Sequence, residues 1–522
     1  MASPAAFAAE TQATQPQPGS LGVIAAFGVF FFTLLTAKWA AEKSREDAEC
    51  HPELRTINGF QNGLAITGCY LSIAALLGIP ALAAAHGQAA MVAILGFFAG
   101  WPLLSLLAER LHNIGGYTFA DLIAWRFPDN RVRIFAALAV FAIAIPYLAV
   151  QLLGAGQLLR LLFGFEYWLA IVIAGALLLA YCNMSGLSAA TWLQIVKAIL
   201  LLCGMFLFVV LVLWKLGVQA DLFHARVLEL KAMLQTDASP ANASPAFPIL
   251  DDPLSLFSLG LTLCLGNLGL PHTLARFSQV PDAREARKSS LWASLWVGFF
   301  CLAMGIVVSG MEAVNQKTRF FDLALVRQDG GNMVILYFAR LLGNEIFMGA
   351  LVAIALVSLA AVAVGMARAA AAALSNDLYA LVLCRGKASA GKEKKLFDLA
   401  LALLFVVATL LALTLTRCNL ALALAFVLAI AASSTAPVLL LTLFWKDCTS
   451  RGLVCGGIAG LLSALVAGFF SPMLWVDLLN RESPLFPYAF PTLFSASAAF
   501  LVAGIVSLAD RGKNAQKERA AW

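Results

Sequence analysis

A long stretch without any charged side chain limits this chain to a small set of folds. From Thr56 to Ala108 the sequence contains no Asp, Glu, Lys or Arg, which leaves room for two membrane-spanning helices of about 20 residues each. The whole chain shares this character, because 61% of its residues are hydrophobic and only 12% are charged. The sequence therefore predicts a protein that crosses a membrane many times.

Apolar runs of this kind recur along the chain and predict about 13 spans. Backbone N–H and C=O groups in hydrocarbon must be satisfied within the spanning structure, and runs of this length indicate helices and not barrel strands. The expected fold class is therefore an all-α polytopic membrane protein. The spans are expected near residues 21–39, 59–83, 88–108, 134–158, 166–183, 189–214, 253–270, 289–311, 346–374, 397–416, 419–445, 452–472 and 488–509.

Two of these runs, the second and the seventh, are interrupted near the middle by polar stretches that contain glycine. The first reads Gly68-Cys69-Tyr70-Leu71-Ser72, and the second reads Gly266-Asn267-Leu268-Gly269-Leu270-Pro271. Interrupted segments at corresponding positions of two halves are typical of inverted-repeat carriers, where unwound backbone supplies polar groups to a substrate near the bilayer midplane. Glycine is also common in membrane helices because it permits close packing, so the breaks alone do not decide between the two explanations.

Basic residues gather in alternate loops between the expected spans, and this pattern orients the chain. Loops rich in Lys and Arg face the cytoplasm, and residues 1–20 contain neither. The N-terminus is therefore expected outside the membrane and the C-terminus inside. The basic residues after the first, third and seventh spans are Lys38, Lys43, Arg45, Arg55, Arg126, Arg131, Arg133, Arg276, Arg284, Arg287 and Lys288.

Counting the spans predicts two five-helix units that each begin with a broken helix. The units cover about residues 59–214 and 253–445, and their orientations are opposite because the second span runs outward and the seventh inward. This is the arrangement of an inverted-topology repeat, with the first span and the last two outside the core. We expect a disordered external tail at 1–20, a transporter domain at 21–509 and a cytoplasmic tail at 510–522.

Several classes of function lack support in the sequence. The ten cysteines include no C-x-x-C pair, so neither a zinc site nor a redox motif is indicated. There is no G-x-x-x-x-G-K-[ST] phosphate loop, so nothing indicates direct use of ATP. The net charge of +6 lies mostly in membrane loops and does not indicate a nucleic-acid partner. We therefore expect no enzymatic activity and no cofactor beyond a coupling ion.

Short motifs along most of the chain support a family assignment. They span residues 59–66, 117–121, 151–156, 190–198, 269–272, 282–289, 377–379 and 486–488. Together they resemble the cation/acetate symporters, a branch of the sodium:solute symporter family. The resemblance covers residues 25 to 509, and the run Asp-Ala-Arg-Glu-Ala-Arg-Lys-Ser at 282–289 is specific enough to exclude a chance match.

The resemblance implies a LeuT-like core that carries a short monocarboxylate such as acetate inward, driven by a cation gradient. Exposed N–H groups and the positive end of a half-helix can bind a carboxylate inside the membrane. A purely structural role is the alternative for Ser72 and Asn267, which would then bridge backbone groups freed by the breaks. The expected substrate-binding residues are Gly68, Cys69, Ser72, Gln151, Gly266, Asn267 and Gly269.

The resemblance also implies a sodium site, but the chain departs from the family pattern there. Relatives place two hydroxyl residues on the ninth span, and counting back from the Asp-Leu-Tyr motif gives Ala361 and Val362 instead. Neither side chain has the hard oxygen ligand that a sodium ion requires. The expected ligands are then the Ser358 hydroxyl, one turn earlier, and the backbone carbonyls of Gly68 and Leu71.

Three further residues are candidates for coupling transport to an ion. Lys197 and Arg368 lie inside expected spans, where an ionisable residue is a functional hypothesis by default. Gln194 stands where many relatives carry Asp, and Cys69 stands where the acetate branch often carries Asp, so both changes remove negative charge. The alternatives are that Arg368 snorkels to the inner surface and that Lys197 pairs with a loop carboxylate.

Taken together, these patterns predict a secondary transporter of a bacterial inner membrane that imports an acetate-like monocarboxylate with sodium or a proton. Its expected partners are a small organic anion and the lipid bilayer, and a small membrane accessory subunit stays open. Two alternatives share the fold. One is a solute sensor that binds without transporting, and the other is a proton-coupled carrier of another small organic anion. Concentrative uptake would separate a carrier from a sensor.

Overall fold

The computed structural model describes most of the chain beyond residue 56. The described residues are 57–520 except 117, 185–186, 236–249, 251, 323–327, 416–417 and 480, together with isolated positions between 22 and 42. The expected tail at 1–20 and much of the expected first span at 21–39 lie outside them. Within the described residues the chain is helical and has no strand, which confirms the all-α fold class.

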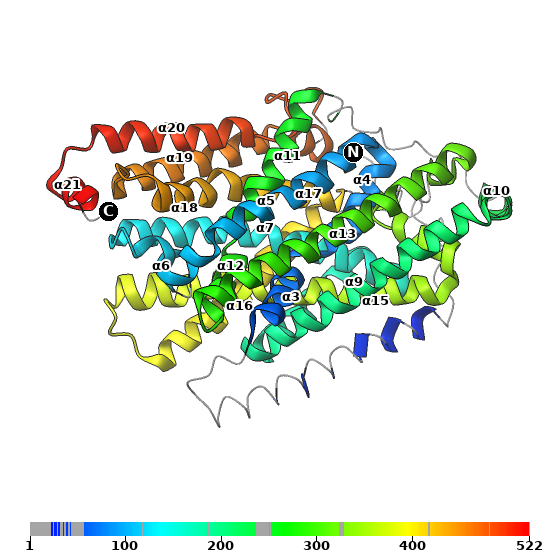
Figure 1. Cartoon of the computed structure of the whole chain (residues 1–522), viewed down its shortest axis with the longest axis horizontal. Coiled ribbons are helices and arrows are strands. Elements are labelled where there is room, and N and C mark those ends of the chain that lie inside the picture. Colours follow the sequence, from blue (N-terminus) through cyan, green and yellow to red (C-terminus); the bar gives the residue numbers. More distant parts are fainter. Residues whose placement is uncertain are drawn as a thin grey trace.

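The long helices run roughly along the longest axis of the molecule and pack side by side (Figure 1). In the described part of the chain, nine helices are long and apolar enough to cross a membrane, and the number rises to 11 if each of two bent helix pairs is one span. The two bent pairs are the segments in which the sequence predicted breaks.

Two sets of helices correspond to the two expected five-helix units. The first comprises α3 (Gly59–Tyr70) with η1 (Ala74–Gly78) and α4 (Ile79–His86), α5 (Gln88–Ile114), α7 (Asn130–Phe163), α8 (Tyr167–Met184) and α9 (Leu187–Gly217). The second comprises α11 (Pro253–Leu268) with α12 (Pro271–Leu274) and η3 (Ala275–Gln279), α13 (Ala283–Thr318), α15 (Val334–Ala372) with η6 (Ala373–Leu383), α16 (Ala390–Thr414), and α17 (Leu420–Ser433) with α18 (Thr435–Phe444). The short α6 (Phe119–Ala124) precedes α7.

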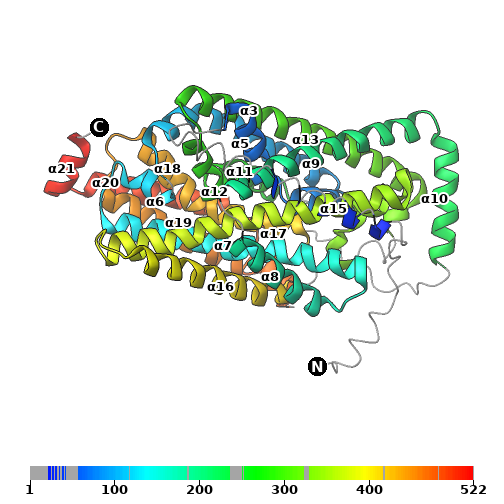
Figure 2. The same ribbon diagram turned by 90° about the horizontal axis from the view of Figure 1, so that it is seen from below.

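The remaining helices lie outside these two sets. The helices α19 (Ser450–Phe469) and α20 (Thr492–Ala509) pack tightly against each other (Figure 1). At one end of the molecule, α21 (Lys513–Ala520) follows α20. At the other end, α10 (Ala220–Gln235) runs across the direction of the long helices (Figure 2). The stretch between the sixth and seventh expected spans therefore includes a helix.

Side-chain caps fix where the two broken helices begin. The Asn58 side chain accepts a hydrogen bond from the backbone N–H of Gln61, and the Gln61 side chain accepts one from the backbone N–H of Asn58. This reciprocal pair is a capping box, which satisfies N–H groups that the first turn leaves without partners. At the start of α11, Asp252 caps the N–H of Ser255 and Pro253 occupies the first helical position, where its missing N–H has no cost.

The helix α15 begins before the ninth expected span, which was placed from residue 346. Its first part, from Val334 to Ala339, is buried. A kink at Gly343 and Asn344 separates this part from the rest of α15, and Asn344 has a positive φ of 66°. The apolar character of Val334–Ala339 explains the burial, because such a segment gains stability by packing against neighbouring helices.

A third break, which the sequence analysis missed, interrupts the eleventh expected span. The helix α17 ends at Ser433, and α18 begins at Thr435 after Ser434, whose φ and ψ are −114° and −71°. The Thr435 hydroxyl donates to the Gly269 carbonyl at 2.7 Å, so this break lies against the break after α11. The run Ser-Ser-Thr-Ala-Pro at 433–437, inside an otherwise apolar segment, was the available signal.

Candidate functional site

The break after α3 leaves backbone oxygens without helical partners in the protein interior. The last helical bond runs from the Leu71 N–H to the Thr67 carbonyl at 2.9 Å, and Leu71 itself is extended with ψ 103°. The helical path resumes at Ala74 with a bend of 60°. The last carbonyls of a helix have no N–H partner within the helix and need hydrogen-bond donors from elsewhere. The carbonyls of Gly68 and Leu71 are among them.

Lys197, from α9, supplies the donor for both carbonyls. Its Nζ lies 2.7 Å from the Gly68 carbonyl oxygen and also donates to the Leu71 carbonyl oxygen. The side chain is fully buried, with 0% exposure. The sequence left a loop carboxylate open as the partner of Lys197, but the partners described here are these two carbonyls. They are also the two backbone ligands that we expected for sodium.

The other oxygens around the expected sodium site do not complete it. Ala361 and Val362 are buried and have no side-chain oxygen. The Ala361 carbonyl accepts a hydrogen bond from Gln194 Nε2 at 3.3 Å. The Ser358 hydroxyl is buried and has no hydrogen-bond partner in the described part of the chain. Since the break carbonyls already bind an ammonium group, Ser358 is the one expected ligand that is still available, and the residues present do not fit a sodium ion.

A second buried cation, Arg276, lies close to Lys197. The sequence placed Arg276 in a cytoplasmic loop, but the structure puts it in η3 with 4% exposure. Its guanidinium donates to the Thr191 hydroxyl and the Gln279 side-chain carbonyl, both at 2.7 Å, and it also donates to Gln194 Oε1. Gln194 therefore binds Arg276 with its oxygen and α15 with its nitrogen.

Cys69 and His272 are both close to the two cations. The Cys69 thiol lies 3.9 Å from the His272 carbonyl oxygen. Both Lys197 and Arg276 are near enough to act electrostatically on Cys69 and on His272. The His272 ring meets the Tyr147 ring edge to face, with their centroids 5.5 Å apart. The sequence provided no reason to expect Tyr147 at a functional site, because a lone aromatic residue in an apolar span does not indicate a binding role.

Close backbone approach holds this group of residues together. A Cβ added to Gly68 would lie 2.0 Å from the Gln194 carbonyl oxygen, so α3 and α9 touch at this point. A Cβ added to Gly365 of α15 would lie 3.3 Å from Gln194 Nε2 and 3.5 Å from Cys69 Sγ. Only glycine at 68 permits the backbone contact between α3 and α9, which places the Gly68 carbonyl within reach of α9.

Ser72, Gln151 and Asn267 are buried polar residues at the breaks, as expected. The side-chain amides of Gln151 and Asn267 have no hydrogen-bond partner in the described part of the chain, and the polar group described next to the Ser72 hydroxyl is that of Tyr147. Buried polar atoms usually have partners, so this arrangement suits a polar ligand. No described hydrogen bond joins the three residues to each other. Ser72 lies beside Tyr147, and Asn267 packs beside Gly100 of α5.

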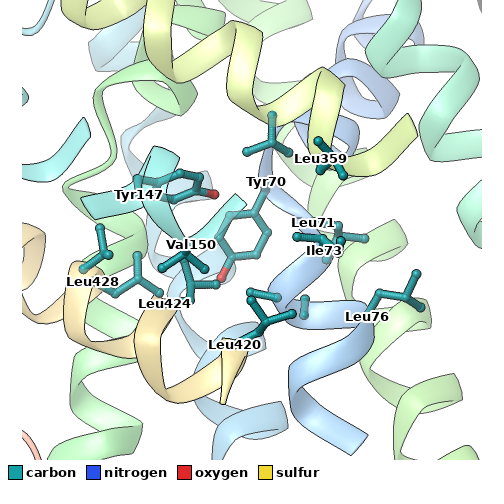
Figure 3. Packing of buried hydrophobic residues seen from close by; sticks show 14 of the residues in the cluster. Tyr70, Leu71, Ile73, Leu76, Tyr147, Val150, Leu359, Leu420, Leu424 and Leu428 are labelled. Atoms are coloured by element: carbon teal, nitrogen blue, oxygen red, sulfur yellow. The ribbon is translucent and has the colours of Figure 1, made fainter. Parts of the chain in front are cut away.

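The surroundings of the α3 break are otherwise apolar. Figure 3 shows Tyr147 from α7 with its hydroxyl directed toward this segment, near Leu71 and Ile73. Leucines of α17 and Leu359 of α15 line the same region (Figure 3). A ligand in this region would therefore contact apolar side chains as well as the unpartnered polar atoms.

The two glycines of the second break have packing roles. A Cβ at Gly266 would lie 2.7 Å from the Leu428 carbonyl oxygen of α17. A Cβ at Gly269 would lie 2.4 Å from the Thr435 hydroxyl and 2.7 Å from the Ala431 carbonyl oxygen. Both glycines therefore let α11 pack closely on α17 and the start of α18.

Arg368 belongs to a different part of the protein. Its guanidinium carbon lies 5.4 Å from the centre of the Phe397 ring of α16, and it interacts electrostatically with Cys182 and Asp398. These contacts agree with the snorkelling alternative. The structure brings together Gly68, Cys69, Leu71, Gln194 and Lys197, but it does not bring Arg368 to them.

The family model described as "Sodium:solute symporter family" matches residues 54–460. The chain belongs to the sodium:solute symporter family. As a member of this family of transporters, it is a multi-pass membrane protein of a kind that performs cation-coupled solute symport, and such transporters are not enzymes.

Solved structures agree on the fold. A Na⁺-coupled sialic acid symporter in a substrate-bound outward-open state has a TM-score of 0.68 and 15% identity, with 94% of this chain and 98% of that chain covered. The nucleobase-cation-symport-1 family transporter Mhp1, in a closed conformation, has a TM-score of 0.50 and 14% identity, with 90% and 97% covered. This symporter therefore has the LeuT-like fold, with the 5+5 core that the spans predicted.

Proposed function

We propose that this symporter imports a short-chain monocarboxylate, with acetate as the reference substrate, by cation-coupled alternating access. The observation that carries the proposal is a pair of buried cations, Lys197 and Arg276, beside the α3 break. In the described part of the chain, the groups bonded to these two cations are two backbone carbonyls, one hydroxyl, two amide side chains and the Cys69 thiol, and none of them is a carboxylate. The described part of the chain therefore brings positive charge to the break with no carboxylate bonded to it.

Electrostatics favours an anionic substrate at such a position. Moving an ion out of water costs several kcal/mol even after the protein relaxes, and neutral hydrogen-bond acceptors offset only part of this cost. A carboxylate near Lys197 and Arg276 adds the missing negative charge. In the low dielectric of the interior this attraction is stronger than in water, so an anion gains more affinity than a neutral molecule of the same shape.

The remaining features of the site suit a small substrate. Gln151 and Asn267 offer amide groups that have no described partner, and Ser72 offers a hydroxyl beside Tyr147. The apolar side chains around the break, among them Leu71 and Ile73, would contact a short alkyl tail (Figure 3). A carboxylate with one or two carbons attached combines both properties. The proposed binding residues are therefore Gly68, Cys69, Ser72, Gln151 and Asn267. Lys197 and Arg276 supply the positive charge that attracts the carboxylate.

Acetate and acetamide provide a matched test because they have nearly the same shape and differ in charge. Purified protein is heated in detergent with increasing concentrations of each compound. A ligand that binds only the folded state raises the melting temperature. Acetate should bind at least roughly tenfold more tightly than acetamide, and Arg276→Gln should reduce this preference. Equal binding of the two compounds would contradict an anion site.

We place the symporter in a bacterial inner membrane, with the N-terminus outside and the C-terminus in the cytoplasm. The bias of basic residues toward alternate loops supports this orientation. Cysteine-accessibility labelling from either side of intact cells tests it at the exposed loops. Labelling of the loop before α13 only from the outside would reverse the orientation.

A further inference from the structure

We propose that Lys197 is a tethered cation that takes the place of sodium at the α3 break, so that this symporter does not bind sodium there. This inference rests on the proposed transport function, but it does not depend on which anion is carried. Its basis is the direct contact of the Lys197 ammonium with the carbonyl oxygens of Gly68 and Leu71. These are the oxygens that a sodium ion at this position would need.

The chemistry of the sodium ion and of the Lys197 ammonium group explains how one can take the place of the other. A sodium ion is held by several oxygen atoms at once, and carbonyl oxygens are suitable ligands. An ammonium group carries the same single positive charge and has three donors that match carbonyl acceptors. Two of them point at the break, so the unit charge that sodium would bring is already present. A sodium ion beside Nζ would meet a like charge at close range.

The neighbouring groups also disfavour sodium. Among the described residues, the Cys69 thiol of α3 and the His272 imidazole of α12 interact electrostatically with Lys197, and the Arg276 guanidinium of η3 acts on the same two groups. Arg276 is positive, and none of the three is a carboxylate. Gln194, a turn before Lys197, keeps its side-chain oxygen on Arg276. An ion entering from this direction would therefore meet positive charge and an amide oxygen that is already bonded.

The position of the lysine is built into the helix packing. The contact between Gly68 and the Gln194 backbone brings α3 against α9 one turn before Lys197. From there the fully buried side chain of Lys197 reaches the end of α3. Ala361 and Val362 have no side-chain hydroxyl to act as a sodium ligand. This agrees with the proposal, because a site that holds an ammonium group does not need such ligands.

If sodium is not used at this site, the driving gradient comes from another cation. Of the two that the sequence left open, the proton is then the one that fits. Sodium-independent uptake driven by an imposed proton gradient is the transport behaviour that this inference predicts.

Equilibrium binding of ²²Na⁺ to the purified full-length protein tests the inference without a substrate. We expect no saturable sodium binding by the wild type or by the control Arg368→Gln. Removing the ammonium group in Lys197→Ala or Lys197→Thr should expose the two carbonyls, and we expect saturable sodium binding to appear in both variants. The Lys197→Thr variant also adds a hydroxyl. Because two different replacements are made, the test can still be carried out if one of the variants does not fold.

Two results would overturn the inference. Saturable sodium binding by the wild type would show that the ammonium group does not fill the site. Folded Lys197→Ala and Lys197→Thr proteins that still bind no sodium would show that the lysine is not what excludes the ion. A failure of acetate to bind or to be transported would instead count against the proposed substrate and would leave the sodium result unchanged.

Discussion

Replacing Gly68 with alanine tests how the helix packing positions the site. The added Cβ would lie 2.0 Å from the carbonyl oxygen, 2.7 Å from the carbonyl carbon and 3.1 Å from the Cα of Gln194. All three are backbone atoms of α9, so no side chain can rotate away. The two helices must separate by roughly 1 Å, because interiors have few voids that can absorb the extra group.

The cost follows from this displacement. Overpacking typically costs 1 to 3 kcal/mol, and a backbone obstacle places Gly68→Ala near the upper end, at about 3 kcal/mol. The Gly68 carbonyl also moves away from Lys197 Nζ, from which it lies 2.7 Å in the wild type. A misplacement of about 1 Å can cost a hundredfold in rate at a site that requires precise geometry, so we expect transport to fall by about that factor.

Gly305→Ala is the matched control. Gly305 lies inside α13, and an added Cβ there would meet no atom within 4 Å. Alanine is favoured over glycine in helices by about 0.5 to 1 kcal/mol, so this variant should be as stable as the wild type or slightly more so. Melting curves in detergent and uptake into proteoliposomes measure both effects. Wild-type stability and uptake in Gly68→Ala would refute the close contact of α3 and α9.

Substitutions at three further residues test their individual roles. Arg276→Gln should weaken acetate binding by about 10- to 100-fold because a charge in the interior is lost, and Arg276→Lys should recover part of it; unchanged affinity in both would remove Arg276 from the site. Arg368→Gln should leave uptake within about twofold of the wild type, since the contacts described for Arg368 are with Phe397, Cys182 and Asp398 and not with the α3 break, and a large loss would return it to the coupling candidates. Ser358→Ala should leave ion dependence unchanged, and loss of a sodium response would show that Ser358 is a ligand after all.

The apolar runs and the two glycine-containing breaks predicted the membrane helices and the bent pairs well. Long charge-free segments leave few alternatives in a bilayer, and a glycine next to polar residues and proline weakens a helix locally. The sequence did not reveal the break between α17 and α18, because serine and threonine residues such as Ser434 and Thr435 also occur within unbroken membrane helices. Its importance comes from the bond between Thr435 and the Gly269 carbonyl, which joins residues far apart in the sequence.

The site itself could be predicted only in part. Lys197 was a candidate because an ionisable residue in a span is unusual, but its contact with the α3 break depends on how two helices cross. Arg276 looked like one more basic loop residue, because it follows the apolar segment directly. Its burial depends on η3 folding back against α9, where Thr191 and Gln194 provide acceptors. Such placement is a property of the packing and cannot be derived from one segment alone.

Concentrative uptake of labelled acetate by the purified protein in proteoliposomes tests the central claim most directly. Sodium and proton gradients are imposed separately, with pyruvate as a competitor and protein-free liposomes as a control. The account predicts accumulation above the external concentration when the proton gradient is present, with no further gain from sodium. No accumulation of acetate under either gradient would contradict the proposed carrier function, as a sensor binds its solute without moving it.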